Sequence, residues 1–168
     1  MTASRGITLS LAVLLLAACS GDPPAAPRAK PADPAAKARV LKEAKALYEK
    51  GSKLLTDGKG REAIVPLRQA IRLGHPGHAV HRDLGQALLG DRQVHEARGA
   101  FGMALSLTPG QVELLILLAR AQLRSGYPRQ AMTSLQAALK KKPGHAGATK
   151  LLAKARTDAA LRGEAKQH

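Results

Sequence analysis

The sequence predicts an all-α protein in which helical hairpins are stacked in a row, and two observations indicate it. Small or apolar side chains return at the same columns of three rows that begin at Ala44, His78 and Val112 and together cover residues 44–145. The rows begin 34 residues apart, and a fixed period of this length is typical of stacked arrays. The 168 residues also include no tryptophan, one phenylalanine and two tyrosines. The interior must therefore be built from alanine and leucine, which suit closely packed helices.

Four columns of the repeat agree in all three rows. The eighth column lies on the first helix of each row and the twentieth lies near the start of the second helix. Small residues at both predict that the two backbones of a hairpin approach closely, while the twenty-fourth and twenty-seventh columns are expected to pack against the next hairpin. In that order the columns hold Gly51, Gly85 and Ala119; Ala63, Ala97 and Ala131; Leu67, Phe101 and Leu135; and Ala70, Ala104 and Ala138.

Start and stop signals divide the rows into helices. Asp33 followed by Pro34 predicts a helix start, because aspartate caps free amides and proline is pre-set for the first helical position. Asp91 is expected to cap the junction inside the second row and Pro128 to begin a later helix, while Pro66 should kink the helix that contains it. The six helices expected in the rows run over about 34–55, 61–73, 77–89, 92–107, 110–124 and 128–141.

The repeated columns resemble the tetratricopeptide repeat family. The resemblance implies a right-handed α-solenoid of about three helical hairpins, with repeats at 44–77, 78–111 and 112–145. We expect a capping helix at 146–161 to close the domain of residues 34–161, and residues 162–168 to form a tail. The aromatic that the family carries at the fourth column is replaced by Leu47, His81 and Leu115, so His81 is expected to pack between helices.

Residues 1–18 predict a bacterial lipoprotein signal peptide. Arg5 precedes an apolar run over 7–18, which is too short to span a membrane. The run ends in Leu16-Ala17-Ala18-Cys19, where Cys19 is the only cysteine. This looks like the lipobox of lipoproteins, and the resemblance implies cleavage before Cys19 and lipidation of its sulfur. The alternative is a general secretory signal that happens to contain a cysteine.

Residues 19–33 are predicted to be the lipidated cysteine and an extended linker, since four prolines interrupt an alanine-rich stretch without a periodic apolar face. Ser20 follows the cysteine where lipoproteins kept in the inner membrane typically carry aspartate. In a cell with two membranes the resemblance therefore favours the periplasmic face of the outer membrane, and in a cell with one membrane it favours the outer face of the plasma membrane. A docking ligand for a partner's aromatic groove is the alternative interpretation of the linker.

The formal charge is +15, and removal of residues 1–18 lowers it only by the one charge of Arg5. Such a basic chain favours an acidic partner. An exported location argues against nucleic acid and in favour of a protein or peptide, together with the membrane through the lipid anchor.

In the tetratricopeptide family the first helices of the hairpins line a concave groove. Carried onto this sequence, the resemblance predicts a basic groove with apolar patches, suited to an acidic peptide. A solvated charged face is the alternative. The predicted groove residues are Tyr48, Arg82, Gln86, Ile116, Arg120, Arg124, Lys150 and Lys154.

Catalytic, cofactor and metal sites have no support in the sequence. His75, His78 and His81 are evenly spaced, but no cysteine or carboxylate pair completes a zinc shell beside them. The chain has no phosphate-binding glycine loop and no nucleophile turn. We expect no enzyme activity, no cofactor and no metal.

The sequence thus favours a lipid-anchored adaptor of the cell envelope that assembles proteins through its groove. A narrower version resembles the pilotin lipoproteins, which help secretins or pili to assemble. A third hypothesis is a structural envelope protein whose basic face binds anionic polymers. The stretch 140–168 bears on that hypothesis, because its lysines and arginines outnumber its two acids, Asp158 and Glu164.

Overall fold

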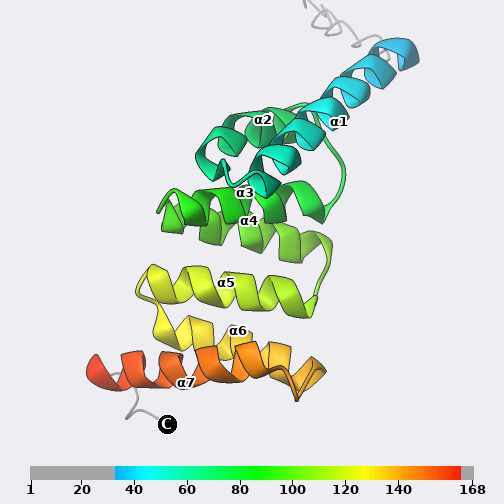
Figure 1. The fold of residues 1–168 in the computed structure, drawn as a ribbon. Coiled ribbons are helices and arrows are strands. Elements are labelled where there is room, and N and C mark those ends of the chain that lie inside the picture. Colours follow the sequence, from blue (N-terminus) through cyan, green and yellow to red (C-terminus); the bar gives the residue numbers. More distant parts are fainter. Residues whose placement is uncertain (1–32, 164–168) are drawn as a thin grey trace, which may run out of the picture. The chain divides into compact units, whose positions relative to one another are not determined.

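Seven α-helices make up the part of the chain that the computed structural model describes, residues 33–163, and this part contains no strand (Figure 1). The expected signal peptide, Cys19 and most of the linker lie outside the described residues. None of the seven helices is long and apolar enough to cross a membrane. In chain order they are α1 (Pro34–Thr56), α2 (Gly60–Arg72), α3 (His78–Gly90), α4 (Val94–Leu107), α5 (Val112–Arg124), α6 (Pro128–Lys141) and α7 (Ala146–Leu161).

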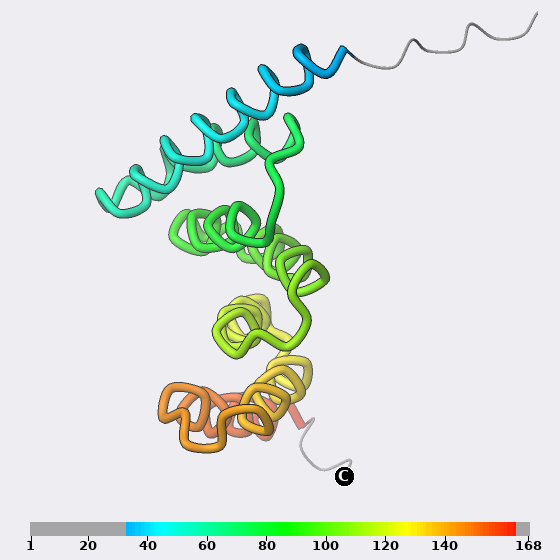
Figure 2. The backbone as a smooth tube through the Cα atoms, turned by 90° about the vertical axis from the view of Figure 1, so that its right-hand side faces the viewer, coloured from blue at the N-terminus to red at the C-terminus, as the bar shows by residue number. Residues whose placement is uncertain are grey.

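The helices pack as three successive hairpins, α1 with α2, α3 with α4 and α5 with α6, and α7 packs on α6. Figures 1 and 2 show these layers in chain order from α1 to α7. The all-α fold predicted from the repeat period is confirmed.

In each of the first two hairpins, a glycine on the first helix packs against a large side chain from the second helix. A Cβ atom placed on Gly51 would lie 2.6 Å from Cγ of Leu67, and one on Gly85 would lie 2.6 Å from Cε1 of Phe101. Leu67 and Phe101 are fully buried. In these two hairpins the twenty-fourth column therefore packs against the eighth column of its own hairpin, whereas the sequence predicts contact with the next hairpin. The missing glycine side chain sets how closely the two helices approach.

Local signals explain the helix ends. Asp33 caps α1, because its carboxylate accepts a hydrogen bond from the backbone N–H of Ala35 at 3.0 Å. Asp91 lies at the junction of the second hairpin as the residue that ends α3, but its carboxylate accepts from the side chain of Gln93 and makes no cap on α4. The α2 helix continues through the buried Pro66 to Arg72, and the expected bend stays a prediction.

The first helices of successive hairpins contact one another, but the second helices do not. The first helices and α7 contact one another in the order α1, α3, α5, α7, whereas the second helices α2, α4 and α6 make no such contacts. Within this helical unit, the first helices therefore lie closer together, and the face that they share is the inner, concave one.

The buried core falls into two clusters of apolar side chains. The first joins the first two hairpins around Leu67 and Phe101, and the second joins the third hairpin to α7 around Leu135 and Leu152. The α5 helix contributes to both, since Ala121 belongs to the first cluster and Ala119 to the second.

Candidate functional site

A hollow of about 390 Å³ lies between α3 and α5 on the inner face. The two residues from α3 are four positions apart, and the four from α5 lie within two turns at the 3–4 spacing of one helical face, so the residues from each helix share one side of it. Four of the eight residues predicted for the groove line this hollow. Its lining consists of Arg82, Gln86, Glu113, Ile116, Leu117 and Arg120.

The hollow has an apolar floor and a polar rim. Ile116 is 5% exposed and forms part of the floor, whereas Gln86 and Arg120 are exposed at the rim. Arg120 makes no ion pair or hydrogen bond with another side chain among residues 33–163. Its guanidinium is therefore available to a carboxylate from outside, with which it can form two parallel hydrogen bonds.

Arg82 is held in place by its neighbour Asp83. The Nε and Nη2 atoms of Arg82 both lie 2.8 Å from Oδ1 of Asp83. The Asp83 side chain is only 5% exposed, and a buried carboxylate of this kind is stable only when charge and hydrogen bonds compensate it. Arg82 supplies that compensation, so it enters the hollow with part of its charge already neutralised.

Tyr48 of α1 completes this cluster. Burial, followed by the charge of Asp83 and a hydrogen bond to it, raises the pKa of the Tyr48 phenol. The Tyr48 ring also packs on the imidazole of His75, with ring centroids 4.5 Å apart. Tyr48 therefore supports the Arg82 end of the hollow through Asp83 and is absent from its lining.

Glu113 places one carboxylate beside the two arginines. Its Oε1 lies 3.5 Å from Nε2 of His145. The other ring nitrogen of His145, Nδ1, accepts a hydrogen bond from the backbone of Ala148 at the start of α7. The proton of a neutral His145 is therefore on Nε2, directed at Glu113.

The other predicted groove residues lie outside this hollow. Arg124 donates from Nη1 to the backbone oxygen of Leu89 at 3.1 Å. Lys154 pairs with Asp158 one turn later in α7 at 3.3 Å, and Lys150 is exposed on the same helix. The structure thus brings together Arg82, Gln86, Ile116 and Arg120 and places the remaining four predicted residues elsewhere.

Asp83 was missed by the sequence analysis, although it organises one end of the site. An aspartate between the buried Val80 and Leu84 on a helix was the available signal, because a charge on an apolar face needs a partner. The sequence pattern does not show that the partners are its own neighbour Arg82 and Tyr48 from the preceding hairpin.

The three evenly spaced histidines do not converge. His75 lies against Tyr48, and His81 is half-buried beside α2 and α4, where burial lowers its pKa. Within residues 33–163, no three histidine, cysteine or acidic side chains are grouped so that they could hold a metal ion.

Comparisons with known proteins agree with this architecture. The family model described as "Tetratricopeptide repeat" matches residues 88–155. Tetratricopeptide repeat protein 33 of Xenopus laevis is 33% identical over 97 residues, which is 58% of this chain. The chain spans only 38% of the length of that relative.

Two solved structures illustrate the shared fold. The second TPR domain of the human RPAP3 protein, in complex with the HSP70 peptide SGPTIEEVD, is 18% identical with a TM-score of 0.63, and the match covers 71% of this chain and 98% of that domain. YrrB, described as a TPR protein with an unusual peptide-binding site, is 20% identical with a TM-score of 0.67, over 79% of this chain and 69% of its own. These similarities show the fold.

Proposed function

We propose that this chain is a lipid-anchored adaptor that binds an acidic protein partner. The family match and the fold support a tetratricopeptide-repeat protein. The hollow between α3 and α5 carries the proposal. There, two arginines and a glutamine surround a buried isoleucine on the inner face of the array.

The chemistry of the hollow selects the partner. Guanidinium groups bind carboxylates in a planar, paired geometry, and the floor at Ile116 offers a place for one apolar side chain. An extended or helical peptide with carboxylates on either side of an apolar residue therefore fits. The HSP70 peptide bound by the human RPAP3 domain has an isoleucine followed by acidic residues, which is this kind of chemistry in a protein of the same fold.

The envelope location rests on the sequence. Cys19 follows two alanines at the end of a short apolar run, and the proline-rich stretch after it would separate the helical domain from the membrane. Lipidation with several acyl chains would anchor the protein stably, where one chain would bind only weakly.

Crosslinking in cells tests the partner. A photoreactive amino acid at Gln86, which is exposed in the hollow, should capture a protein, and Arg120→Glu should abolish that capture. Arg39→Glu is the matched control, because Arg39 is exposed on α1 outside the hollow and the charge change is identical. Capture that is unchanged in Arg120→Glu would overturn the groove proposal. A secretin among the captured proteins would support the pilotin version.

The anchor has its own experiment. Mass spectrometry of the protein isolated from membranes should show an acylated N-terminal Cys19, and Cys19→Ser should release the protein into the soluble fraction. An unmodified Cys19 would contradict the anchor without affecting the groove. Salt-sensitive sedimentation with purified anionic envelope polymer, in the absence of any captured protein, would instead favour the structural hypothesis.

A further inference from the structure

A second and larger hollow, of about 660 Å³, lies between α2 and α4. The walls come from these two second helices and the floor from α3, so the hollow is separate from the one on the inner face. It opens because α2 and α4 make no backbone contact with each other. The residues that define this outer groove are Val65, Arg72, Leu84, Leu88, Gly99 and Met103.

Apolar side chains dominate the outer groove. Leu84 and Leu88 are buried at its floor, but Val65 and Met103 on opposite walls are 60% and 53% exposed. Large apolar side chains left this exposed on two facing helices form a patch of the kind that binds another molecule. A covering segment would remove both from water, which stabilises a complex by about 25 cal/mol for each Å² of apolar surface buried.

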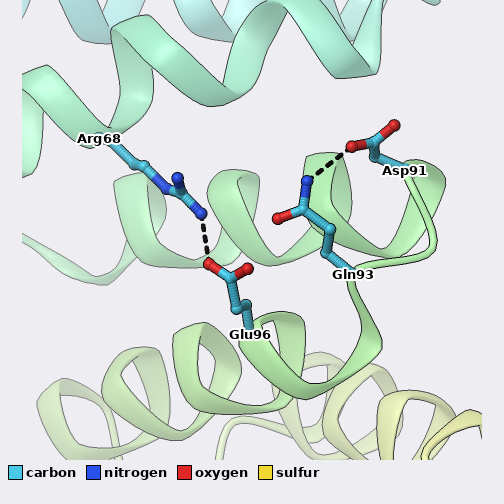
Figure 3. A network of polar contacts seen from close by, with 4 residues as sticks. All are labelled: Arg68, Asp91, Gln93 and Glu96. Atoms are coloured by element: carbon cyan, nitrogen blue, oxygen red, sulfur yellow. Dashed lines mark hydrogen bonds and ion pairs between the residues drawn. The ribbon is translucent and has the colours of Figure 1, made fainter.

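One ion pair spans the walls. Arg68 of α2 reaches down to Glu96 of α4, as Figure 3 shows. Arg72 lies on the same side of α2 one turn later and has no ion-pair or hydrogen-bond partner among the described side chains. The groove therefore has one acidic group that is already paired and one guanidinium that is not.

The corresponding positions one repeat later have different chemistry. There, Gln122 replaces Leu88 of the outer groove, and Ser134 replaces Ala100, which also lines this hollow. These two polar side chains are buried and hydrogen-bonded to each other at 2.9 Å. The apolar lining is therefore not a general consequence of stacking hairpins in this chain.

We propose that the outer groove binds an apolar helical segment of a partner protein whose flank carries carboxylates. The free guanidinium of Arg72 selects an acidic flank, and the chain's charge of +15 disfavours a second copy of itself. The α2 wall from Val65 to Arg72 is about 10 Å long. Two turns of a helix, with leucines at spacings of three and four residues, match that length.

Two glycines of α4 make a matched test. A Cβ atom on either Gly99 or Gly102 would meet nothing within 4 Å, and both residues are exposed, but only Gly99 lines the groove. Gly99→Leu would therefore place a side chain in the groove, whereas Gly102→Leu would add the same side chain to the same helix outside it. Both variants should retain the helix content measured by circular dichroism.

The probe is a short fluorescent peptide, about four helical turns long, with leucines on one helical face and glutamates elsewhere. Its binding to the full-length chain is followed by anisotropy, and a second peptide has lysine in place of each glutamate. We expect the glutamate peptide to bind more tightly than the lysine peptide. Gly99→Leu and Arg72→Glu should each weaken its binding by about tenfold, while Gly102→Leu and Arg120→Glu should leave it within about twofold.

The proposal is overturned if Gly99→Leu binds as tightly as the unchanged chain, or if Gly102→Leu weakens binding equally. Equal binding of the lysine peptide would also overturn it, since the acidic flank would then have no role. Sedimentation supplies an independent result. A dimer that dissociates in Gly99→Leu would show that the occupant is a second copy of the chain and would contradict a separate acidic partner.

Discussion

The guanidinium of Arg124 donates a hydrogen bond to the backbone oxygen of Leu89, which lies one hairpin earlier in the chain. Leu89 lies in the last turn of α3, where carbonyl oxygens favour a cation, and its oxygen also accepts a hydrogen bond from the backbone N–H of Arg92 at 3.4 Å. A similar contact recurs further along, because Arg162 donates to the backbone oxygen of Gly126 at 2.7 Å. Arg124, which the sequence places in the ligand groove, thus connects two successive hairpins.

Replacing Arg124 should therefore lower the stability of the fold more than replacing Arg120, which lines the inner hollow. Arg124→Ala is expected to lower the free energy of unfolding by about 1 kcal/mol, because a carbonyl at a helix end loses a charged donor. Arg120→Ala should change it by less than about 0.5 kcal/mol. Urea denaturation followed by circular dichroism measures both, and equal stabilities would contradict the structural role of Arg124.

Arg92 has a backbone conformation that favours glycine. Its φ is +61°, and the residues at the same place in the neighbouring repeats, Gly58 and Gly126, have φ of +75° and +83°. Arg92→Gly should raise the free energy of unfolding by about 0.5–1 kcal/mol, since an L-residue in this region is strained. Thermal denaturation provides the measurement. Gly58→Ala, which meets no neighbouring atom, is the converse control and should destabilise the fold.

The phenol of Tyr48 should ionise above its ordinary pKa of 10.0. The contribution of Tyr48 to stability is then present below pH 10 and is lost as the pH rises through the higher folded pKa. Absorbance titration at alkaline pH in a Tyr127→Phe background isolates this group. Asp83→Asn should bring the Tyr48 pKa down, and an unchanged titration would show that Asp83 does not act on Tyr48.

His81 should make the fold sensitive to acid. Burial lowers its pKa from the ordinary 6.5, so the folded chain favours the neutral imidazole. The stability that depends on this residue is present above pH 6.5 and is lost as the pH falls toward the lower folded pKa. His81→Leu should reduce the loss of urea resistance between neutral and mildly acidic pH. A parallel loss in both proteins would assign the effect to other groups.

The repeat period made much of the fold predictable. Helix order follows from apolar periodicity and from local signals such as Asp33, which depend only on neighbouring residues in the chain. The resemblance to the tetratricopeptide family also placed four residues of the hollow, because Arg82, Gln86, Ile116 and Arg120 occupy the groove positions that the family has on the first helix of each repeat. None of these inferences requires knowing how two successive hairpins are offset.

Contacts between rows were not predictable in the same way. Whether Arg124 faces a ligand or the end of another helix depends on how two hairpins are offset, and the period alone does not specify that offset. The same offset between hairpins determines that Asp83 pairs with Tyr48 and that the outer groove opens between α2 and α4. Side-chain volume and charge across hairpins decide these features.

The division of the core into two clusters bears on how the domain opens. Hydrogen exchange reveals cooperative units that often coincide with supersecondary motifs, and we expect the two clusters to behave as two such units, with α5 as the helix that belongs to both. Because the inner hollow joins α3 to α5, a bound peptide would couple the amide exchange of the two units. Peptide bound in the inner hollow would then slow the amide exchange of α7, a helix that does not line this hollow.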